Sequence, residues 1–417
     1  MPDLFLGLDI GTSGARTVAI DKEGTIFGEG QATMAEFGAN HRSPQQWWRA
    51  CEKAVKMALA QADVNAIRAI AVDGTSGTMI PVNSDFVPLA DGSMYNDICA
   101  NQNILGNIRK FAPDGSPAVG ANSALARALI FMELCPALVL HQADWVACQF
   151  SAQAKSDENN ALKTGYDLNS KDWPDWICAT GLDHSVLPEV VEPGTVIGSI
   201  SPAACQNFGL RSDVLVVAGT TDGCASFVAT GADQTGDGVT ALGTTMTIKL
   251  LSDRAISAPQ YGIYAHRILG KWLVGGASNT GGRVLLKYFD ADRLKCLSDQ
   301  IDPEEDCSLD YYPLAERGER FPVNDPKLEP RVSPRPGDDA EFLKGLLDGI
   351  ARIEAQAYAR LHELGAPKLS SVRTVGGGAR NGVWSRLRER RLGVEVKPSA
   401  SNQAAYGAAL LAMRGAS

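Results

Sequence analysis

The sequence predicts an α/β fold in two related domains, and three observations support this prediction. The chain has 417 residues, which is too long for one ordinary hydrophobic core. Strands, a helix and another strand follow one another in its first 74 residues. A strand–turn–strand pattern near the start, LGLDIGTSGARTVAID, recurs past mid-chain as GVTALGTTMTIKLLSD. We therefore expect a duplicated architecture with domains 1–232 and 233–417, divided at the polar, turn-like segment 232–237.

The first domain is expected to open with an antiparallel three-stranded meander. Residues 4–10 are apolar and β-prone, Gly11–Gly14 interrupt them, and ARTVAID and TIFGEGQ predict two further strands around a DKEG turn. A helical period then covers 44–62, with Pro44 suited to the first turn. The apolar segments IRAIAVDG and DVLVVAGTTDG predict buried strands that end in polar turns. The mixed segment 98–210 predicts no definite order of elements.

The second domain repeats this logic and adds a glycine-rich turn. Residues 238–253 predict a strand, a Gly-Thr-Thr turn and a strand. Residues 372–393 predict a strand, the turn GGGARN and a helix, and the apolar segment QAAYGAALLAMRG predicts a final helix.

Composition excludes several classes of protein. The formal net charge of −9 gives no general attraction for nucleic acid or for acidic membrane surfaces. Four arginines near the C-terminus are interpreted as one face of a charged helix: Arg386, Arg388, Arg390 and Arg391. No signal peptide and no apolar run of about 20 residues is visible, so we expect a cytoplasmic protein without a membrane partner.

Cysteine and histidine usage points the same way. The nine cysteines form no C-x-x-C pair, which is typical of reduced thiols in a cytoplasm. The five histidines show no metal-ligand spacing, so a zinc site is not expected.

Two turns have the composition of phosphate-binding loops. Phosphate binding needs several backbone N–H groups converging on one point, which glycines permit and Thr or Ser hydroxyls supplement. The turn Gly11, Thr12 and Ser13 meets this description, with Arg16 nearby to supply positive charge. A second turn of the same kind consists of Gly243, Thr244 and Thr245. Neither a P-loop nor a Rossmann glycine pattern is present, and each turn taken alone could be only a turn.

Three aspartates end strands beside these turns: Asp9, Asp73 and Asp222. Phosphoryl transfer requires Mg²⁺ to neutralise the polyphosphate and a carboxylate to accept the proton of the attacking hydroxyl. Asp9, beside the first turn, suits magnesium directly or through water, and Asp222 suits the general base. The alternative is that each aspartate caps a helix or closes a turn.

Six segments in this order resemble the FGGY carbohydrate kinases: DIGTSGAR, GTTDG, GTT, GERFP, GGGARN and AAYGAALLA. The resemblance runs over nearly the whole chain, and the order of the segments is more specific than any one of them. It implies membership of the actin, sugar-kinase and chaperone ATPase superfamily. The implied fold is two duplicated actin-like (ribonuclease H-like) ATPase domains with a cleft between them. The implied activity is ATP-dependent phosphorylation of a sugar.

The resemblance also implies residue roles. Asp9 matches the aspartate near the metal and the reacting phosphate, and Asp222 matches the catalytic base. The N-terminal domain would bind the sugar and carry out catalysis, and the C-terminal domain would bind the nucleotide. The implied ATP-binding residues are Gly11, Thr12, Ser13, Arg16, Gly243, Thr244, Thr245, Gly376, Gly377, Gly378 and Asn381. The implied co-substrate and cofactor are ATP and Mg²⁺.

The resemblance is closest to a short branch of ribulose-kinase-like members. DGTSGT at 73–78, YND at 95–97 and SDENNALKTGYD at 156–167 carry it, and they imply that Ser76 binds the sugar with Asp9 and Asp222. D-ribulose is therefore the expected substrate; D-xylulose, L-ribulose and glycerol are the alternatives. An actin- or chaperone-like ATPase switch and a non-catalytic sugar sensor remain open, as does a monomeric or homodimeric state. The chain is shorter than usual for the family, and Gln403 stands where an acidic residue is frequent.

Overall fold

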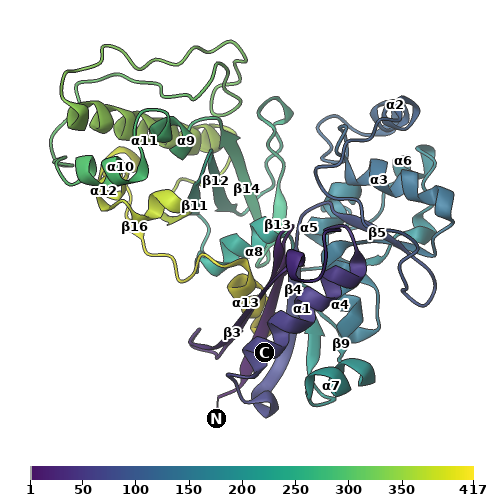
Figure 1. The fold of residues 1–417 in the computed structure, drawn as a ribbon. Helices are drawn as coiled ribbons and strands as arrows, with labels where there is room; N and C mark the ends of the chain where they lie inside the picture. The colour runs from purple at the N-terminus through teal and green to yellow at the C-terminus, as the bar shows by residue number, and fades with distance from the viewer. Residues whose placement is uncertain (1) are drawn as a thin grey trace. The chain divides into compact units, whose positions relative to one another are not determined.

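The computed structural model describes residues 2–417, which form two compact units (Figure 1). Unit 1 contains the chain up to Ala229, the short segment His266–Leu269 and the C-terminal segment Gln403–Ser417. Unit 2 contains Thr230–Ala265 and Gly270–Asn402. Grouping by contacts thus differs from a single cut at 232/233, because the last helix returns to the first sheet. The assignment of sugar and nucleotide binding to the two domains stays a prediction.

Unit 1 is built on a six-stranded sheet with the order β3-β2-β1-β4-β10-β9. The first three strands form the predicted antiparallel meander, while β1 pairs in parallel with β4, and β4 with β10. The strands are β1 (Leu4–Ile10), β2 (Gly14–Ile20), β3 (Ile26–Thr33), β4 (Ile67–Gly74), β9 (Val196–Ser199) and β10 (Leu215–Val217).

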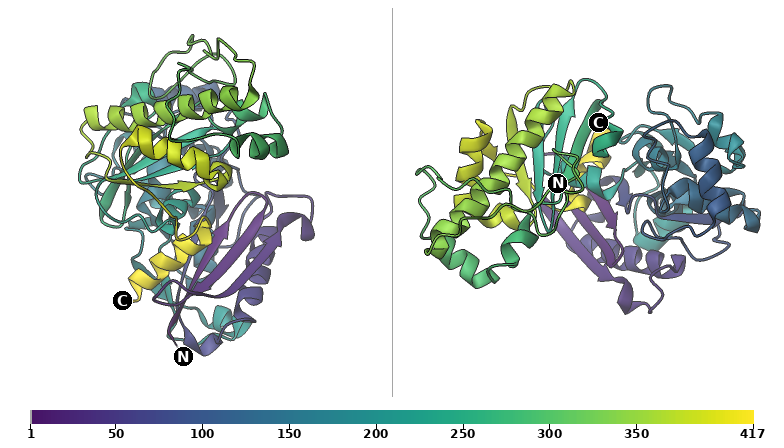
Figure 2. Two further views of the ribbon diagram at one scale, coloured as in Figure 1. Left: turned by 90° about the vertical axis from the view of Figure 1, so that its left-hand side faces the viewer. Right: turned by 90° about the horizontal axis from the view of Figure 1, so that it is seen from above.

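Helices α1 (Pro44–Leu59) and α13 (Ala404–Gly415) cover opposite faces of this sheet. A Cβ atom added to Gly30 of β3 would lie 1.9 Å from the carbonyl oxygen of Ala54 in α1. A Cβ atom added to Gly7 of β1 would lie 1.9 Å from the carbonyl oxygen of Ala405 in α13. Side chains alternate between faces along a strand, and the register places Gly30 opposite Thr17 and Gly7 opposite Val18. Figure 2 shows α13 beside the strands of the meander.

The small residues of α13 permit unusually close packing. A Cβ atom added to Gly407 would lie 1.9 Å from the carbonyl oxygen of Ala225 in helix α8 (Asp222–Ala229). Helix α13 therefore packs against both the sheet and α8.

The segment that the sequence could not order forms the rest of unit 1. Its helices and strands outside the six-stranded sheet are α2 (Gln102–Phe111), α3 (Ala124–Phe131), β6 (Leu138–His141), α4 (Gln142–Ser151), β7 (Lys155–Asp157), α5 (Glu158–Ala161), α6 (Trp176–Ala179), β8 (Glu189–Val191) and α7 (Pro202–Phe208). Strand β5 (Met79–Val82), which precedes this segment, pairs with β6. Part of the segment packs in a separate cluster that includes Leu105, Leu125 and Ile177, while α4 and α7 contribute Val146, Phe150 and Phe208 to the core of the first sheet.

A second six-stranded sheet has the order β13-β14-β12-β11-β15-β16. Its strands are β11 (Asp237–Leu242), β12 (Met246–Ser252), β13 (His266–Ile268), β14 (Lys271–Ser278), β15 (Ser371–Val375) and β16 (Val396–Lys397). Unit 2 is built on five of these strands, β14, β12, β11, β15 and β16, while the residues of β13 are grouped with unit 1. The helices of unit 2 are α9 (Gly282–Leu286), α10 (Ala291–Ser298), α11 (Asp339–Glu363) and α12 (Gly382–Leu392). The long helix α11 supplies much of the core, including Leu343, Leu346 and Ile350.

The two sheets share one topology. In each, a first strand pairs antiparallel with the second and parallel with a strand from much later in the chain. Strands β1, β2, β3 and β4 thus correspond to β11, β12, β14 and β15. The predicted duplication is confirmed. Over residues 2–417, no helix is both long enough and apolar enough to cross a bilayer.

Candidate active site

Three carboxylates of unit 1 come together at the ends of neighbouring strands. Asp9 of β1 lies opposite Asp73 of β4 in the parallel register. Both side chains share the sheet face of Gly7, which α13 covers, because residues two apart on a strand point the same way. Asp222 begins helix α8, and Thr221 before it forms a bridge with Gly74 after Asp73. The two aspartates predicted to be functional therefore lie beside the third.

Burial and mutual repulsion perturb this group. Burial raises the pKa of Asp9, the charge of Asp222 raises it further, and Arg16 opposes the shift. Burial raises the pKa of Asp73 well above its usual value, and the charges of Asp9 and Asp222 add to the effect. The side chain of Asp73 is fully buried, and its interaction with the carboxyl group of Asp9 raises its pKa further. Perturbed carboxylates grouped in this way are typical of reactive sites.

The first predicted phosphate loop connects β1 to β2 next to this group. The N–H of Gly11 donates to the carbonyl oxygen of Gly14 at 2.9 Å, which closes the turn. Thr12 and Ser13 are exposed at its tip. Arg16 lies opposite Asp9 in the antiparallel register, so its charge is beside the carboxylates.

Ser76 lies in the turn after β4. The turn is held by Thr75, whose hydroxyl oxygen lies 2.7 Å from the side-chain oxygen of Gln142 and 2.7 Å from the hydroxyl of Thr78. The hydroxyl of Ser76 is buried and has no hydrogen-bond partner within the described chain. A buried hydroxyl without a partner costs free energy, so a ligand hydroxyl at this point would be stabilising.

Residues 157–160, which the sequence connected only with substrate class, pack against the strand end that carries Asp222. The side-chain amide of Asn159 donates to the hydroxyl of Thr220 at 2.9 Å and to the carbonyl oxygen of Arg267 at 2.7 Å. Asp157 is fully buried, and burial raises its pKa to about 7. The consecutive acidic and amide residues at 157–160 were the only sign of a site in the sequence. Their burial depends on tertiary packing and could not be predicted from the sequence.

In unit 2 the second predicted phosphate loop joins β11 to β12. Gly243, Thr244 and Thr245 are all exposed, and the N–H of Gly243 donates to the carbonyl oxygen of Thr245 at 3.2 Å. The glycine-rich turn after β15 lies against the end of β11. Gly376 has a φ of +87°, and an added Cβ would lie 2.7 Å from the carbonyl oxygen of Leu242. Only glycine fits at position 376. This close approach also shows that the glycine-rich turn lies beside the Gly243–Thr245 loop.

A cavity of about 560 Å³ opens beside Gly376, within the usual range for small-molecule sites. It is lined by Thr374, Val375, Gly376, Ala379, Ser385 and the segment 396–402. Of the predicted glycine turn only Gly376 lines it; Gly377 has open space around its Cα, and Gly378 packs against Leu242 and Trp384. The Pro- and Ser-containing segment 396–402 was not predicted as part of a site.

Asn381, which was predicted to bind adenosine, has a structural role at the start of helix α12. Its side-chain oxygen accepts from the N–H of Trp384 at 3.0 Å and so caps α12. Its amide donates to the hydroxyl of Ser298 at 2.9 Å. Both ends of the side chain are therefore already engaged.

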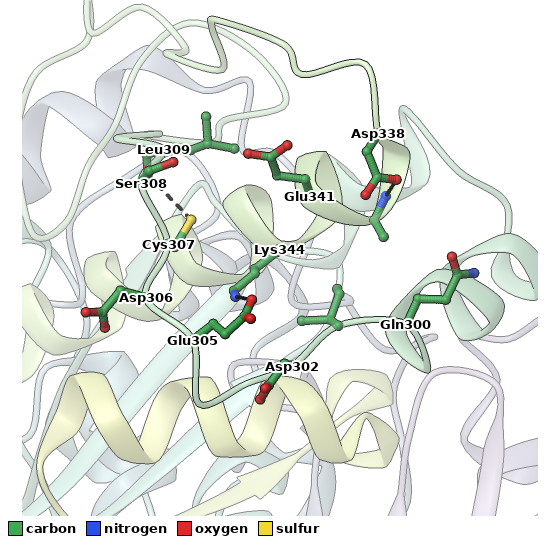
Figure 3. Close-up of a pocket in the computed structure, with 12 residues that line it drawn as sticks. Gln300, Asp302, Glu305, Asp306, Cys307, Ser308, Leu309, Asp338, Glu341 and Lys344 are labelled. Atoms are coloured by element: carbon green, nitrogen blue, oxygen red, sulfur yellow. Dashed lines mark hydrogen bonds and ion pairs between the residues drawn. The ribbon is translucent and has the colours of Figure 1, made fainter.

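A second pocket of unit 2, about 220 Å³ in volume, contains none of the predicted site residues (Figure 3). Lys344 reaches from α11 toward the carboxylate of Glu305 at 3.5 Å, among several further acidic residues. This pocket is distinct from the cavity beside Gly376.

No group of three or more His, Cys, Asp or Glu side chains suited to hold a metal exists among residues 2–417. Magnesium in phosphoryl-transfer sites is held through one or two carboxylates, with phosphates and water completing its shell. Asp9, with its carboxylate beside Asp73, supplies a donor of this kind.

Two family models match the chain. The N-terminal domain of the FGGY family of carbohydrate kinases matches residues 4–108 and 131–229, and the C-terminal domain of that family matches residues 238–416.

Curated relatives are similar over most of their length. The xylulose kinase of Escherichia coli K12 is 23% identical over 413 residues, covering 92% of this chain and 84% of that protein. The autoinducer-2 kinase of Enterobacter sp. strain 638 is 25% identical over 463 residues, covering 99% and 86%.

Solved structures share the fold. The xylulose kinase from Rhodospirillum rubrum superposes with a TM-score of 0.83 at 20% identity, covering 99% of this chain and 90% of that one. The gluconate kinase from Lactobacillus acidophilus gives 0.81 at 18% identity, covering 100% and 89%. The predicted two-domain α/β kinase fold is confirmed.

Proposed function

Because the chain belongs to the FGGY family of carbohydrate kinases, we propose that it phosphorylates a ketopentose, and first among these D-ribulose, to give D-ribulose 5-phosphate. The family membership confirms the predicted enzyme class, an ATP-dependent phosphotransferase acting on a carbohydrate. The substrate rests on the resemblance of segments 73–78, 95–97 and 156–167 to the short ribulose-kinase-like branch.

The three neighbouring carboxylates of Asp9, Asp73 and Asp222 support the phosphoryl-transfer part of this proposal. Asp222 is the general base: its carboxylate accepts the proton of the primary hydroxyl as that oxygen attacks the γ-phosphorus. The new O–P bond forms as the bond between the γ-phosphorus and the bridging oxygen breaks, and ADP leaves. The charge of Asp222 raises the pKa of both Asp9 and Asp73, so the proposed base lies among carboxyl groups that influence one another's protonation.

Ser76 and Asp9 complete the sugar site in this proposal. The buried Ser76 hydroxyl lacks a partner, and a polyol supplies one. A site with such groups discriminates strongly against analogues that lack the matching hydroxyl.

The nucleotide is assigned to both phosphate loops and to the cavity beside Gly376. The exposed residues Thr12, Ser13, Thr244 and Thr245 of the two turns offer backbone N–H groups and hydroxyls to the phosphates. The 560 Å³ cavity is large enough for the adenosine. Magnesium, held through Asp9 directly or through water, would neutralise the polyphosphate charge.

D-xylulose is the second candidate, because two curated relatives, of which this chain matches 84% of the length, are xylulose kinases. The relatives named as autoinducer-2 kinases add a further acceptor to be tested. The cytoplasmic location and the monomeric or homodimeric state stay predictions.

The test is a substrate panel. Purified protein with Mg-ATP is assayed against D-ribulose, D-xylulose, L-ribulose, gluconate, glycerol and the autoinducer-2 precursor, and the phosphoester is identified by NMR. We expect the highest kcat/KM with D-ribulose and a 5-phosphate product. A higher value with D-xylulose selects the second candidate. Slow ATP hydrolysis indifferent to every acceptor would instead support an ATPase switch, and sugar binding without product a sensor.

A further inference from the structure

We propose that Glu319, in the GERFP segment, is a positioning residue that holds the Gly243–Thr245 loop in the shape that binds the ATP phosphates. This inference rests on the proposed role of that loop in ATP binding. Glu319 does not contact the loop itself; it acts through the segment Ser278–Arg283, which follows strand β14.

The carboxylate of Glu319 organises the end of β14. The side chain is buried, with 2% exposure. It accepts hydrogen bonds from the hydroxyl of Ser278 at 2.6 Å, from the N–H of Asn279 at 2.8 Å and from its neighbour Arg320 N–H at 2.9 Å. The hydroxyl of Ser278 in turn accepts from the N–H of Thr280 at 3.1 Å. One carboxylate therefore fixes three consecutive residues.

The fixed segment closes directly over the phosphate loop. The N–H of Met246 donates to the carbonyl oxygen of Thr280 at 2.7 Å. The N–H groups of Gly282 and Arg283 donate to the carbonyl oxygens of Gly243 and Thr244 at 2.8 and 3.2 Å. The carbonyl groups of Gly243 and Thr244 are held by these hydrogen bonds, while Gly243, Thr244 and Thr245 are still exposed residues.

The contact is too close to tolerate a shift. Gly281 has a φ of +148°, and an added Cβ would lie 2.8 Å from the carbonyl oxygen of Thr244. Movement of the Ser278–Arg283 segment would therefore displace the loop.

The rest of the GERFP segment anchors Glu319 from behind. The backbone of Glu319 pairs with that of Asp325 through hydrogen bonds of 2.8 and 2.9 Å. Phe321 is fully buried, and its ring fills the space above Gly276, where a Cβ atom would lie 2.6 Å away. The carboxylate is thus presented to Ser278 from a packed support, as a positioning group requires.

The decisive measurement compares Glu319→Gln with a matched control. The glutamine keeps the volume but removes the charge that accepts from Ser278 and Asn279. We expect KM for ATP and Kd for ADP to rise about tenfold, since a hydrogen bond to a charged group is typically worth that factor. KM for the sugar and Kd for adenosine, which carries no phosphate, should stay within twofold.

Asp348→Asn is the control. Asp348 is another buried carboxylate of unit 2, bonded to Arg391 at 2.7 and 2.9 Å and remote in sequence from the loop. It should lower Tm while leaving Kd for ADP unchanged, because it loosens a helix pair and not the phosphate loop. A merely structural role for Glu319 predicts the same pattern for Glu319→Gln.

A second variant tests the inference if Glu319→Gln does not fold. Ser278→Ala removes the hydroxyl that links Glu319 to Thr280, and we expect Kd for ADP to rise roughly threefold. Unchanged ADP affinity in either folded variant overturns the inference. The double variant Thr244→Val, Thr245→Val distinguishes the proposed role of the loop from the proposed role of Glu319. If ADP affinity is unchanged in this double variant as well, the loop does not bind the phosphates and the proposed function of the loop is wrong. If ADP affinity falls in the double variant but not in Glu319→Gln, only the positioning role of Glu319 is wrong.

Discussion

The two hairpins of the duplicated sheets hold different residues at equivalent positions. Asp9 lies two residues before Gly11 and pairs with Asp73, whereas Ala241 lies two residues before Gly243 and pairs with Val375. The backbone has one topology in both units, yet only unit 1 has carboxylates at these strand ends. In our proposal, proton transfer and metal binding therefore belong to the hairpin of unit 1, and the hairpin of unit 2 contributes phosphate binding alone.

The two units also differ in whether their buried carboxylates have an ion-pair partner. In unit 1, Asp73 and Asp157 have no lysine or arginine within ion-pair distance in the described chain, and burial raises both pKa values. In unit 2, Glu354 forms a two-bond ion pair with Arg388 at 2.6 and 2.7 Å, and Asp348 one with Arg391. These two ion pairs of unit 2 join helix α11 to helix α12, whereas Asp73 and Asp157 of unit 1 are buried without such a pair in the described chain.

The largest effect expected from this contrast is on catalysis in unit 1. Asp222→Asn should lower sugar-dependent kcat by about 10²–10⁴-fold, because it removes the proton acceptor. ATP binding, measured by calorimetry, should be retained. The control is Asp183→Asn, an exposed cap in the same unit that accepts from Ser185 at 2.8 Å. Retention of more than roughly a tenth of the rate in Asp222→Asn contradicts the general-base role.

The next effect is on stability in unit 2. Arg388→Met leaves Glu354 buried without its ion-pair partner and should lower the free energy of unfolding by about 3–5 kcal/mol. Urea unfolding measures the loss. The double variant with Glu354→Met should recover most of it, since it removes the unpaired charge. Equal losses in the single and double variants would show that packing, and not charge, dominates there.

A smaller effect concerns pH and Asp157. Its folded-state pKa of about 7 lies above the unfolded value of 3.8, so the folded protein binds the proton more tightly. The stabilisation is complete below about pH 4 and is lost as pH rises toward 7. Asp157→Asn removes this loss, so its stability relative to the wild type should improve by roughly 2 kcal/mol between pH 5 and pH 7. Parallel pH profiles in urea unfolding would refute the assignment.

The smallest effect is expected at Gln403, which donates from the surface to the carboxylate of Glu29 at 3.0 Å. Gln403→Glu places two like charges together and should cost no more than about 0.5 kcal/mol. Half-molar salt should remove the difference in unfolding free energy, because it screens exposed charges. A loss of kcat would show that this helix start contributes to the site after all.

Local patterns predicted the strands and loops that hold the site. Alternating and continuous apolar runs predicted β1, β4 and β11, and the glycine and hydroxyl residues predicted both hairpin turns. These features are local because they depend on residues next to each other in the chain. The segment 98–210 gave no such pattern, since its short helices are stabilised by packing on one another.

Sequence alone determined the two hairpins, the aspartates at the strand ends and the family to which the chain belongs. Only the tertiary structure decided that Asp73 lies beside Asp9, that Asp157 is buried and that α13 returns to the first sheet. It also decided that Glu319 fastens the end of β14. The physical reason is that register, burial and hydrogen bonding between distant segments arise only when the sheets and helices pack together.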